Sequence, residues 1–337
     1  MKFSIVIAAY NAENYIHECI CSFLTQTFRD FEIVVVDDGS SDRTKLEIQR
    51  FALIDERVIY LGGQHVGQGA SRMKGLEIAR GEYIIFFDAD DIALETMLER
   101  LNSLLKDDTD ILIFGAGNFR DGTRGIGYRI ENLPDTASTG YVDLNAHENN
   151  IFQTTFGWAW DKVYKREFVL KNCLSFPNLK HSEDLVFTYG SLTLKPTVFL
   201  CKELLVLHRV GNKKSVSMTR QTDPIAHLKA IEMLIKNYPK IERTCFSITF
   251  KNWLVHFLFW HIATIGPSYR RQVLNETKQF LQTKKYASDY RYLSCWNKLK
   301  LNLMEGDWLI YILLNMYDLT PKNHLASLRK LFRITKL

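Results

Sequence analysis

The sequence lacks the features that mark several specialised classes of protein. It contains no run of about 18 apolar residues, so a membrane-spanning helix is not expected. Neither an internal repeat nor a low-complexity tract is present. The apolar content of 46% and the charged content of 24% are those of an ordinary globular protein, so disorder is not expected away from the termini.

Cysteine is scarce, and its spacing matches no motif. The six cysteines form no CxxC pair and no Cys/His arrangement typical of zinc sites. A chain of 337 residues is also too long to depend on disulfides for its core. Residues 1–7 are apolar but short, which favours a buried strand over a signal peptide. We therefore expect a cytoplasmic protein with reduced thiols.

The common glycine-rich phosphate loops are missing as well. The sequence has no GxGxxG dinucleotide fingerprint and no Walker lysine loop. The absence of a phosphate loop rich in glycine and lysine near the N-terminus argues against a nucleotidyltransferase. We keep that class as an alternative, because such an enzyme would also use a parallel sheet and metal-binding carboxylates.

Charge is unevenly distributed along the chain. Residues 225–337 hold 18 Lys and Arg against 7 Asp and Glu, a net charge of +11, whereas residues 1–224 carry −6. Basic residues between positions 322 and 336 alternate with leucines and a phenylalanine, a pattern suited to an anionic membrane surface. A solvated basic face, a packed C-terminal helix or a homodimer contact explains the same pattern. No partnership with nucleic acid is expected.

The first 115 residues alternate between strand-like and helix-like segments. Short apolar runs that end in polar or glycine residues are typical of buried strands. They lie at Phe3–Ala9, Glu32–Asp37, Arg57–Leu61, Glu82–Asp88 and Asp110–Gly115. Because both faces of these strands are apolar, the pattern predicts an α/β fold with a mostly parallel sheet covered on both sides. Ligands then bind beyond the carboxyl ends of the strands.

We expect three regions. Residues 1–115 form a nucleotide-binding half, and residues 116–222 form a second half that begins with a long irregular stretch over 116–150. Residues 223–337 are predicted to be helical and basic. Ser41 or Asp42 is the expected N-cap of the second helix.

Three carboxylates stand at the end of one apolar strand. Asp88, Asp90 and Asp91 follow Tyr83–Phe87, and like charges so close together are costly unless a cation neutralises them. Oxygen ligands suit Mn²⁺ or Mg²⁺, which can bridge to phosphate oxygens. Capping of a helix over 94–105 by Asp90 or Asp91 is the alternative, and it explains one carboxylate only.

Four further segments carry candidate functional groups. Asp38, before Gly39, can accept hydrogen bonds from a base or ribose, and Arg72 can present a cation to a nucleotide unless it is a surface residue. Glu183 and Asp184 begin a helix as caps, or one of them is a general base. The segment from His208 to Ser217 holds three cations and two serine hydroxyls, which suits closure over a diphosphate.

In this order the segments resemble family 2 glycosyltransferases, inverting enzymes with the GT-A fold, particularly bacterial ones that assemble surface polysaccharides. The resemblance covers about residues 1–220. Ser4–Asn11 (SIVIAAYN) is similar to the nucleotide-binding strand, and Val34–Asp42 to the uridine-contacting turn. Gly67–Asp91 is similar to the arginine segment with the DxD motif. Residues 160–166 resemble the W-x-K-x-Y-x-R segment, and Glu183–Asp184 the catalytic ED pair.

The resemblance implies a role for each matching residue. Asp184 is the base, with Glu183 beside it. Among the metal-site residues, Asp90 ligates the metal, Asp88 faces the ribose or the metal, and Asp91 supports the site. His208 is either a third ligand or structural. The residues expected to contact the nucleotide-sugar are Ala9, Tyr10, Asn11, Asp38, Arg72, Asp88, Ala89, Arg209, Ser215 and Ser217. The sequence departs from the family pattern at Ala9, at Met73 and at Ser182, where glycine often precedes the ED pair.

The implied reaction is transfer of a hexose or N-acetylhexosamine from a UDP-sugar to a hydroxyl of a glycan, glycolipid or glycoprotein. A metal stabilises the departing diphosphate while a base activates the acceptor on the opposite face of the sugar. A membrane-associated binding protein that has lost turnover is the other alternative, against which the intact acidic residues argue. The expected location is the cytoplasm, with peripheral contact at the inner face of the membrane as one role for the basic tail.

Overall fold

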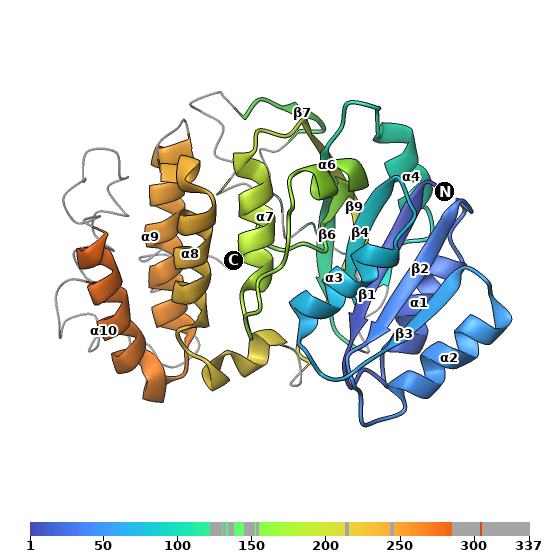
Figure 1. The fold of residues 1–337 in the computed structure, drawn as a ribbon, viewed down its shortest axis with the longest axis horizontal. Coiled ribbons are helices and arrows are strands. Elements are labelled where there is room, and N and C mark those ends of the chain that lie inside the picture. Colours follow the sequence, from blue (N-terminus) through green and yellow to red (C-terminus); the bar gives the residue numbers. More distant parts are fainter. Residues whose placement is uncertain are drawn as a thin grey trace. The chain divides into compact units, whose positions relative to one another are not determined.

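A computed structural model describes residues 1–121, 130, 133, 138–144, 152, 155–212, 216–242, 246–284 and 304 (Figure 1). The chain divides into two compact units, Met1–Lys213 and Lys214–Leu337. The division lies before the boundary expected at position 222. Position 115 lies inside a strand, so the two predicted halves belong to a single unit.

Four parallel strands form the N-terminal half of the sheet in the first unit. They are β1 (Phe3–Ala9), β2 (Phe31–Asp37), β3 (Val58–Gly62) and β4 (Tyr83–Asp88), in the order β3-β2-β1-β4. Every residue of β1 and β2 is buried, as expected for strands covered on both faces. The four predicted strands are therefore confirmed to within a residue at each end.

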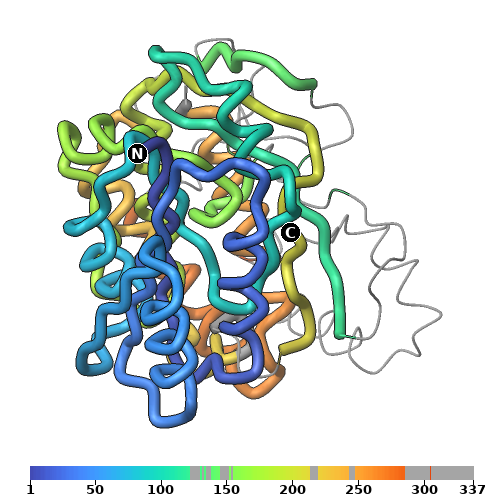
Figure 2. Tube along the Cα trace, turned by 90° about the vertical axis from the view of Figure 1, so that its right-hand side faces the viewer, coloured from blue at the N-terminus to red at the C-terminus, as the bar shows by residue number. Residues whose placement is uncertain are grey.

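The other half of the sheet is mixed in direction. It contains β5 (Ile92–Ala93), β6 (Ile111–Phe119), β7 (Gly140–Val142), β8 (Lys162–Lys165) and β9 (Val198–Arg209). Strand β8 lies antiparallel between β4 and β6, whereas β6 and β9 are parallel. The course of the chain through these strands can be followed by colour in Figure 2. Strand β6 continues to Phe119, which corrects the irregular stretch expected from position 116.

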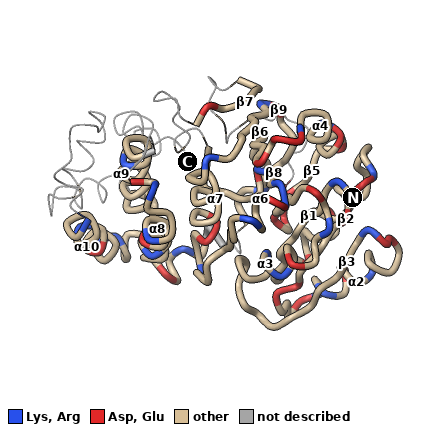
Figure 3. Tube along the Cα trace, turned by 45° about the horizontal axis from the view of Figure 1, so that its top comes forward, with Lys and Arg blue, Asp and Glu red and all other residues tan. Residues whose placement is uncertain are grey.

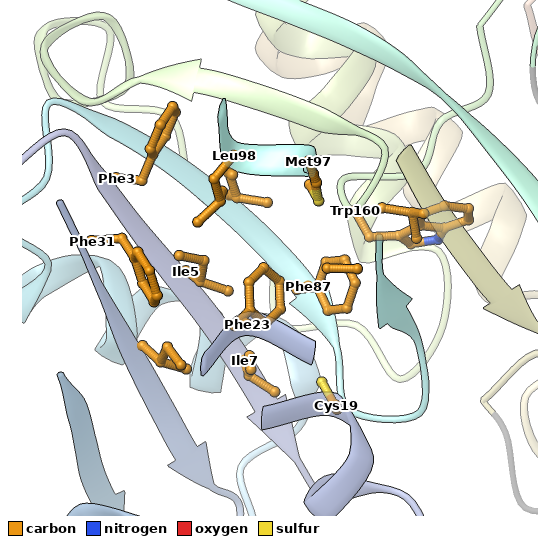
Figure 4. Close-up of a cluster of buried hydrophobic side chains, with 14 of the residues drawn as sticks. Phe3, Ile5, Ile7, Cys19, Phe23, Phe31, Phe87, Met97, Leu98 and Trp160 are labelled. Atoms are coloured by element: carbon orange, nitrogen blue, oxygen red, sulfur yellow. The ribbon is translucent and has the colours of Figure 1, made fainter. Parts of the chain in front are cut away.

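Helices cover both faces of this sheet. On one face α1 (Ile16–Leu24), α2 (Thr44–Ile54) and α4 (Met97–Leu104) bury Phe23, Phe51 and Leu98 against alternate residues of β1, β2 and β4 (Figure 4). On the other face lie α3 (Gln68–Ile78) and α7 (Glu183–Thr193). A Cβ at Gly75 of α3 would lie 2.4 Å from Val6 Cγ1, so this glycine permits the close approach to β1.

Two expected helix caps differ from the structure. Helix α2 begins at Thr44, after Arg43, and Asp42 instead accepts the Thr44 amide with its Oδ1 atom at 3.0 Å. Helix α4 begins at Met97 after Thr96, so neither Asp90 nor Asp91 caps it. The capping explanation of the acidic cluster is therefore wrong.

The second unit is helical, as predicted. Its elements are η1 (Val216–Thr222), α8 (Ala226–Asn237), η2 (Pro239–Glu242), α9 (Phe246–Thr264) and α10 (Pro267–Thr283). Among the described residues, none of the helices combines the length and the apolar character needed to cross a bilayer. The basic segment over 322–336 lies outside the described residues, so its expected contacts stay predictions.

A buried carboxylate joins the amino-end edges of the central strands. Glu32 on β2 is fully buried and accepts hydrogen bonds from Ser4 Oγ at 2.6 Å and from the Arg80 amide at 2.7 Å. The Arg80 guanidinium adds Nη2–Oε2 at 2.6 Å. Burial alone would raise the pKa of Glu32, but the bonds from Ser4 and Arg80 outweigh it and lower the pKa.

We expect Glu32→Gln to lower the free energy of unfolding by about 1–3 kcal/mol at pH 7, because a charged acceptor with buried donors is lost. Urea unfolding followed by circular dichroism measures it. The lowered pKa means that the charge stabilises the fold above the ordinary pKa of 4.5 and that this contribution is lost as the pH falls through the folded-state pKa. The difference between wild type and variant should therefore narrow in acid. Glu56→Gln, at an exposed glutamate, should change stability by less than about 0.5 kcal/mol, and an equal effect there would contradict the assignment.

Candidate active site

Parallel pairing brings the candidate groups to one edge of the sheet. In register, Ala9 of β1 lies opposite Asp37 of β2, and Ala8 lies opposite Asp88 of β4. The residues that follow these strands, Tyr10 and Asp38 among them, therefore emerge at the same carboxyl edge. This is the edge at which open α/β sheets bind ligands.

The loop after β1 is braced by Asn11. Its backbone adopts a left-handed conformation with φ of 49°, which asparagine tolerates better than most residues. Asn11 Oδ1 accepts the Ser41 amide at 2.9 Å, and the Asn11 amide donates to Ser40 Oγ at 2.9 Å. Asn11 thus joins the loops after β1 and β2. Its expected contact with a nucleotide stays a prediction.

Tyr10 presents an aromatic surface beside this brace. The residue is 50% exposed, and its ring stacks on His65 with centroids 4.2 Å apart. His65 Nδ1 lies 2.9 Å from Asp38 Oδ2. His65 was missed by the sequence analysis, because a single histidine in a polar loop carries no local signal of such a contact.

Asp38 organises the loop that precedes α3. Its Oδ1 accepts the Val66 amide at 2.8 Å, and its Oδ2 accepts the Gly67 amide at 2.9 Å. The residue is only 3% exposed. Gly39 turns the chain with φ of 75°, and a Cβ there would lie 2.8 Å from His65 N, so a glycine is required. Asp38 therefore shapes the loop that carries His65.

Arg72 is a buried bridge between two acidic motifs. Its Nη2 lies 2.7 Å from Asp88 Oδ1, and its Nη1 lies 3.2 Å from Glu183 Oε1. The side chain is 2% exposed and lies over the Phe176 ring. Burial opposes its charge, but Asp88 and Glu183 outweigh burial and raise the pKa. The surface alternative for Arg72 is therefore wrong.

The three carboxylates after β4 have separate partners. Asp88 is partly buried and also accepts Gln68 Nε2 at 3.1 Å. Asp90 Oδ2 accepts Asn212 Nδ2 at 3.0 Å, and burial together with the charge of Asp88 raises its pKa. Asp91 is fully buried. Hydrogen-bond donors of the protein thus stabilise part of the negative charge that was expected to require a metal ion.

His208 and Arg209, consecutive on β9, bind Asp91. His208 Nδ1 lies 2.9 Å from Asp91 Oδ2, and the Arg209 amide donates to Asp91 Oδ1 at 2.9 Å. Burial opposes the charge on His208, but Asp91 outweighs burial and raises the pKa to about 9. Both carboxylate oxygens of Asp91 are thus engaged by residues of β9, and its expected role at a metal site stays a prediction.

Arg209 is engaged within the protein, and its expected contact with a nucleotide stays a prediction. Arg209 is 5% exposed, and its Nε donates to the Asp90 carbonyl at 2.9 Å. Its two Nη atoms contact Glu18 and Asp121, and its guanidinium lies over the rings of Tyr15 and Phe119. Every part of the guanidinium is engaged within the protein, so Arg209 holds the loop after β4 in place.

Four other residues were expected to contact the nucleotide-sugar, and they are two alanines and two serines. Ala9 is fully buried, with a relative exposure of 0%, and Ala89 packs in the hydrophobic cluster with an exposure of 9%. The expected nucleotide contacts of these two alanines stay predictions. Ser215 and the side chain of Ser217 lie outside the described residues, and their roles stay predictions.

The acidic pair starts helix α7 after a strained residue. Ser182 adopts φ of 65°, a left-handed conformation at the position where the family often has glycine. Glu183 is buried against Arg72, whereas Asp184 is partly exposed and its Oδ1 accepts the Leu185 amide at 2.8 Å. Burial raises the pKa of both carboxyls above their ordinary values. Asp184 is thus the more accessible of the two.

A divalent cation needs several ligand atoms gathered in one place. Among the described residues, no group of three or more His, Cys, Asp or Glu side chains is gathered closely enough to hold a metal ion. Mg²⁺ and related ions in phosphate sites commonly take one or two carboxylates and complete their shell with phosphate oxygens and water. Asp88 and Asp90 are sufficient for that kind of site.

The fold is of the GT-A type, as predicted. S. aureus TarS residues 1–349, solved in complex with UDP-GlcNAc, superposes with a TM-score of 0.66 at 22% identity, over 84% of this chain and 81% of that one. The same protein solved with UDP covers 91% of both chains at 21% identity and the same TM-score.

Sequence comparison identifies the family. The family model for glycosyl transferase family 2 matches residues 4–169. A cholesterol galactosyltransferase of Borreliella burgdorferi is 31% identical over 315 residues, 86% of each chain. The putative glycosyltransferase EpsH of Bacillus subtilis is 32% identical over 213 residues, which span 61% of this chain and only 60% of EpsH. The chain belongs to glycosyl transferase family 2.

We expect Ser182→Gly to raise the free energy of unfolding by about 0.5–1 kcal/mol, because glycine adopts the left-handed conformation without the steric cost that serine carries. Chemical denaturation measures the change. Ser182→Ala keeps the Cβ and should give no gain. Equal stabilisation by both variants would show that backbone strain at position 182 is not the cause.

Proposed function

We propose that this protein is an inverting glycosyltransferase. It moves a hexose or N-acetylhexosamine from a UDP-sugar to a hydroxyl of a glycan or glycosylated carrier. The observation that carries the proposal is the buried bridge of Arg72, which ties Asp88 of the acidic cluster to Glu183 of the ED pair. It brings a candidate leaving-group site and a candidate base into one network.

The donor side of the site consists of groups on the loops after β1, β2 and β4. The exposed ring of Tyr10 suits stacking on a nucleobase, and its contact with His65 fixes the orientation of that ring. Asp88 and Asp90 would hold Mn²⁺ or Mg²⁺, whereas His208 is occupied by Asp91. The bound cation would stabilise negative charge on the departing diphosphate. The presence of UDP-GlcNAc in TarS supports a uridine nucleotide as donor.

The acceptor side is centred on Asp184. Its carboxyl is partly exposed at the first turn of α7, while Glu183 is occupied by Arg72. In the ionised form, Asp184 accepts the proton of the acceptor hydroxyl as the oxygen attacks the anomeric carbon. Attack from the face opposite the diphosphate inverts that carbon. Because burial raises the pKa of Asp184, a larger share of the base is protonated in mild acid than for an exposed aspartate.

The experiment that tests the function is a donor screen. Purified protein is incubated with UDP-glucose, UDP-galactose or UDP-GlcNAc, with and without Mn²⁺, and release of UDP is measured. Metal-dependent release from at least one donor supports the proposal. No binding and no turnover with any of the three, in either condition, would contradict it.

We expect Asp184→Asn to lower turnover by at least about 100-fold, the scale of a lost general base, while UDP affinity stays nearly unchanged. Steady-state kinetics and UDP titration calorimetry check the two parts. Asp107→Asn, at an exposed site, should leave both values at wild-type level. If Asp184→Asn retains turnover, the base is Glu183 or another group.

Mn²⁺ is expected to raise the affinity of the wild-type protein for UDP. We expect Asp90→Ala to reduce this gain by at least about tenfold, because a ligand to the bridging ion is lost. Titration of UDP with and without Mn²⁺ measures this gain. Glu95→Ala, at a nearby exposed carboxylate, should keep the full metal effect. An unchanged metal effect in the Asp90 variant would refute its role as a ligand.

A further inference from the structure

The lysine of the W-x-K-x-Y-x-R segment is buried in the first unit. Lys162 lies on β8 with an exposed fraction of 0%. Its ammonium group has three N–H donors, and each has an acceptor. The acceptors are Asp161 Oδ1 at 2.5 Å, the Trp158 carbonyl at 2.8 Å and the Phe156 carbonyl at 3.0 Å. A buried ion pair adds little to stability compared with apolar packing, so these contacts indicate a role in holding one conformation of the backbone.

The backbone around these two carbonyls, residues 155–158, lies against helix α7. The hydroxyl of Tyr189 donates to the first carbonyl of this segment at 3.1 Å. A Cβ at Gly157 would lie 3.0 Å from Tyr189 Cε2 and 3.4 Å from Leu185 Cα, so a glycine permits the close approach of the segment to the helix. Because Leu185 directly follows Asp184, the segment supports the turn of α7 that carries the proposed base.

Thr188 joins α7 to a carbonyl that Lys162 also holds. Its Oγ1 donates to the Trp158 carbonyl at 3.3 Å. A threonine hydroxyl inside a helix commonly bonds to a carbonyl of its own helix. Thr193 of α7 does so, with Oγ1 2.7 Å from the Gly190 carbonyl. The Trp158 carbonyl therefore accepts one hydrogen bond from β8 and one from α7.

Lys162 also acts on the proposed base by its charge. Burial raises the pKa of Asp184 to about 6, with a further contribution from Asp88. Arg72 and Lys162 oppose this rise, and Glu183 is the ionisable neighbour on α7. A general base must be ionised to accept a proton, and the charge of Lys162 favours that form. Strand β8 and helix α7, which carry the two groups, are coloured by charge in Figure 3.

On the basis of the proposed function, we propose that Lys162 is a positioning residue for the base Asp184. It holds the Trp158 carbonyl in place for the hydroxyl of Thr188, one helical turn after Asp184, and so fixes the start of α7. A base must lie within hydrogen-bond reach of the hydroxyl that it deprotonates, and a displacement of about 1 Å can cost about 100-fold in rate. Support from a buried strand keeps the carboxylate where it is needed.

Thr188→Val tests the contact with little change in shape, because valine lacks the hydroxyl donor. Release of UDP from a donor that the wild type turns over gives kcat and the donor KM, and calorimetry gives the affinity for UDP. We expect kcat to fall by at least about fivefold, because the base is displaced. The donor KM and the UDP affinity should stay within about twofold, since no donor contact is removed. Thr188→Ser keeps the hydroxyl and should keep kcat within about twofold.

Thr193→Val is the matched control, since it removes a buried hydroxyl of the same helix that bonds within α7. It should leave kcat unchanged. Lys162→Met should lower kcat by at least about tenfold while the UDP affinity stays at the wild-type value. Lys162→Met/Asp161→Asn removes both charges of the buried pair and should show the same loss, and it is measured beside the single variant, which is at risk of unfolding. Thermal unfolding of each variant is recorded.

Retention of wild-type kcat in Thr188→Val, or in either folded variant of Lys162, would overturn the proposal. So would a loss of kcat in Thr193→Val or Thr188→Ser as large as that in Thr188→Val. A parallel loss of kcat and UDP affinity would also overturn it, because it indicates a structural role for the whole site. Wild-type protein that turns over no UDP-sugar refutes the proposed function, and this inference with it.

Discussion

The guanidinium of Arg72 is the interaction on which the rest of the site depends. Asp88 and Glu183 come from a β-strand and a helix that are far apart in the sequence, and both carboxylates face the same buried volume. Without a cation between them they would repel each other and would be costly to bury. With Arg72 in place, their charges orient the start of α7 toward the end of β4. The ring of Phe176 covers the guanidinium and limits its access to water, which strengthens both ion pairs.

Ion pairs and hydrogen bonds also hold the acidic residues that lie beyond this bridge. Asp91 is held by His208 and by the Arg209 amide, while the Arg209 side chain holds the Asp90 carbonyl. Two consecutive residues of β9 thereby fix the loop after β4 in a single conformation. The ring of His208 is in turn stacked on Trp160, a residue of the hydrophobic cluster, so the acidic loop is anchored to the core. The carboxylates of the proposed metal site and the pair that holds the proposed base are therefore joined by contacts within the protein.

Much of the first unit could be predicted because its signals are local. Apolar runs that end in polar residues gave β1, β2 and β4, and parallel pairing then placed Asp38 and Asp88 at the same edge. The side-chain partners could not be predicted in this way. Arg209 was expected to face a nucleotide, yet it is buried among Glu18, Asp90 and two aromatic rings. His65, Asn212 and Trp158 were given no role, because nothing beside them in the sequence reveals what they contact.

The sequence by itself determined the positions of β1 to β4, the carboxylates at the ends of these strands and the resemblance that the family match confirmed. Only the tertiary structure decided which acidic residue is buried, which is accessible and which cation faces each. The pattern of apolar residues repeats over a few positions, so strands and helices can be predicted from the sequence alone. Ion pairs such as Arg72 with Glu183, or Asp91 with His208, join residues more than a hundred positions apart. Their geometry depends on how the whole sheet and its helices pack, and that packing is what assigned Asp91 to His208 and left Asp184 accessible.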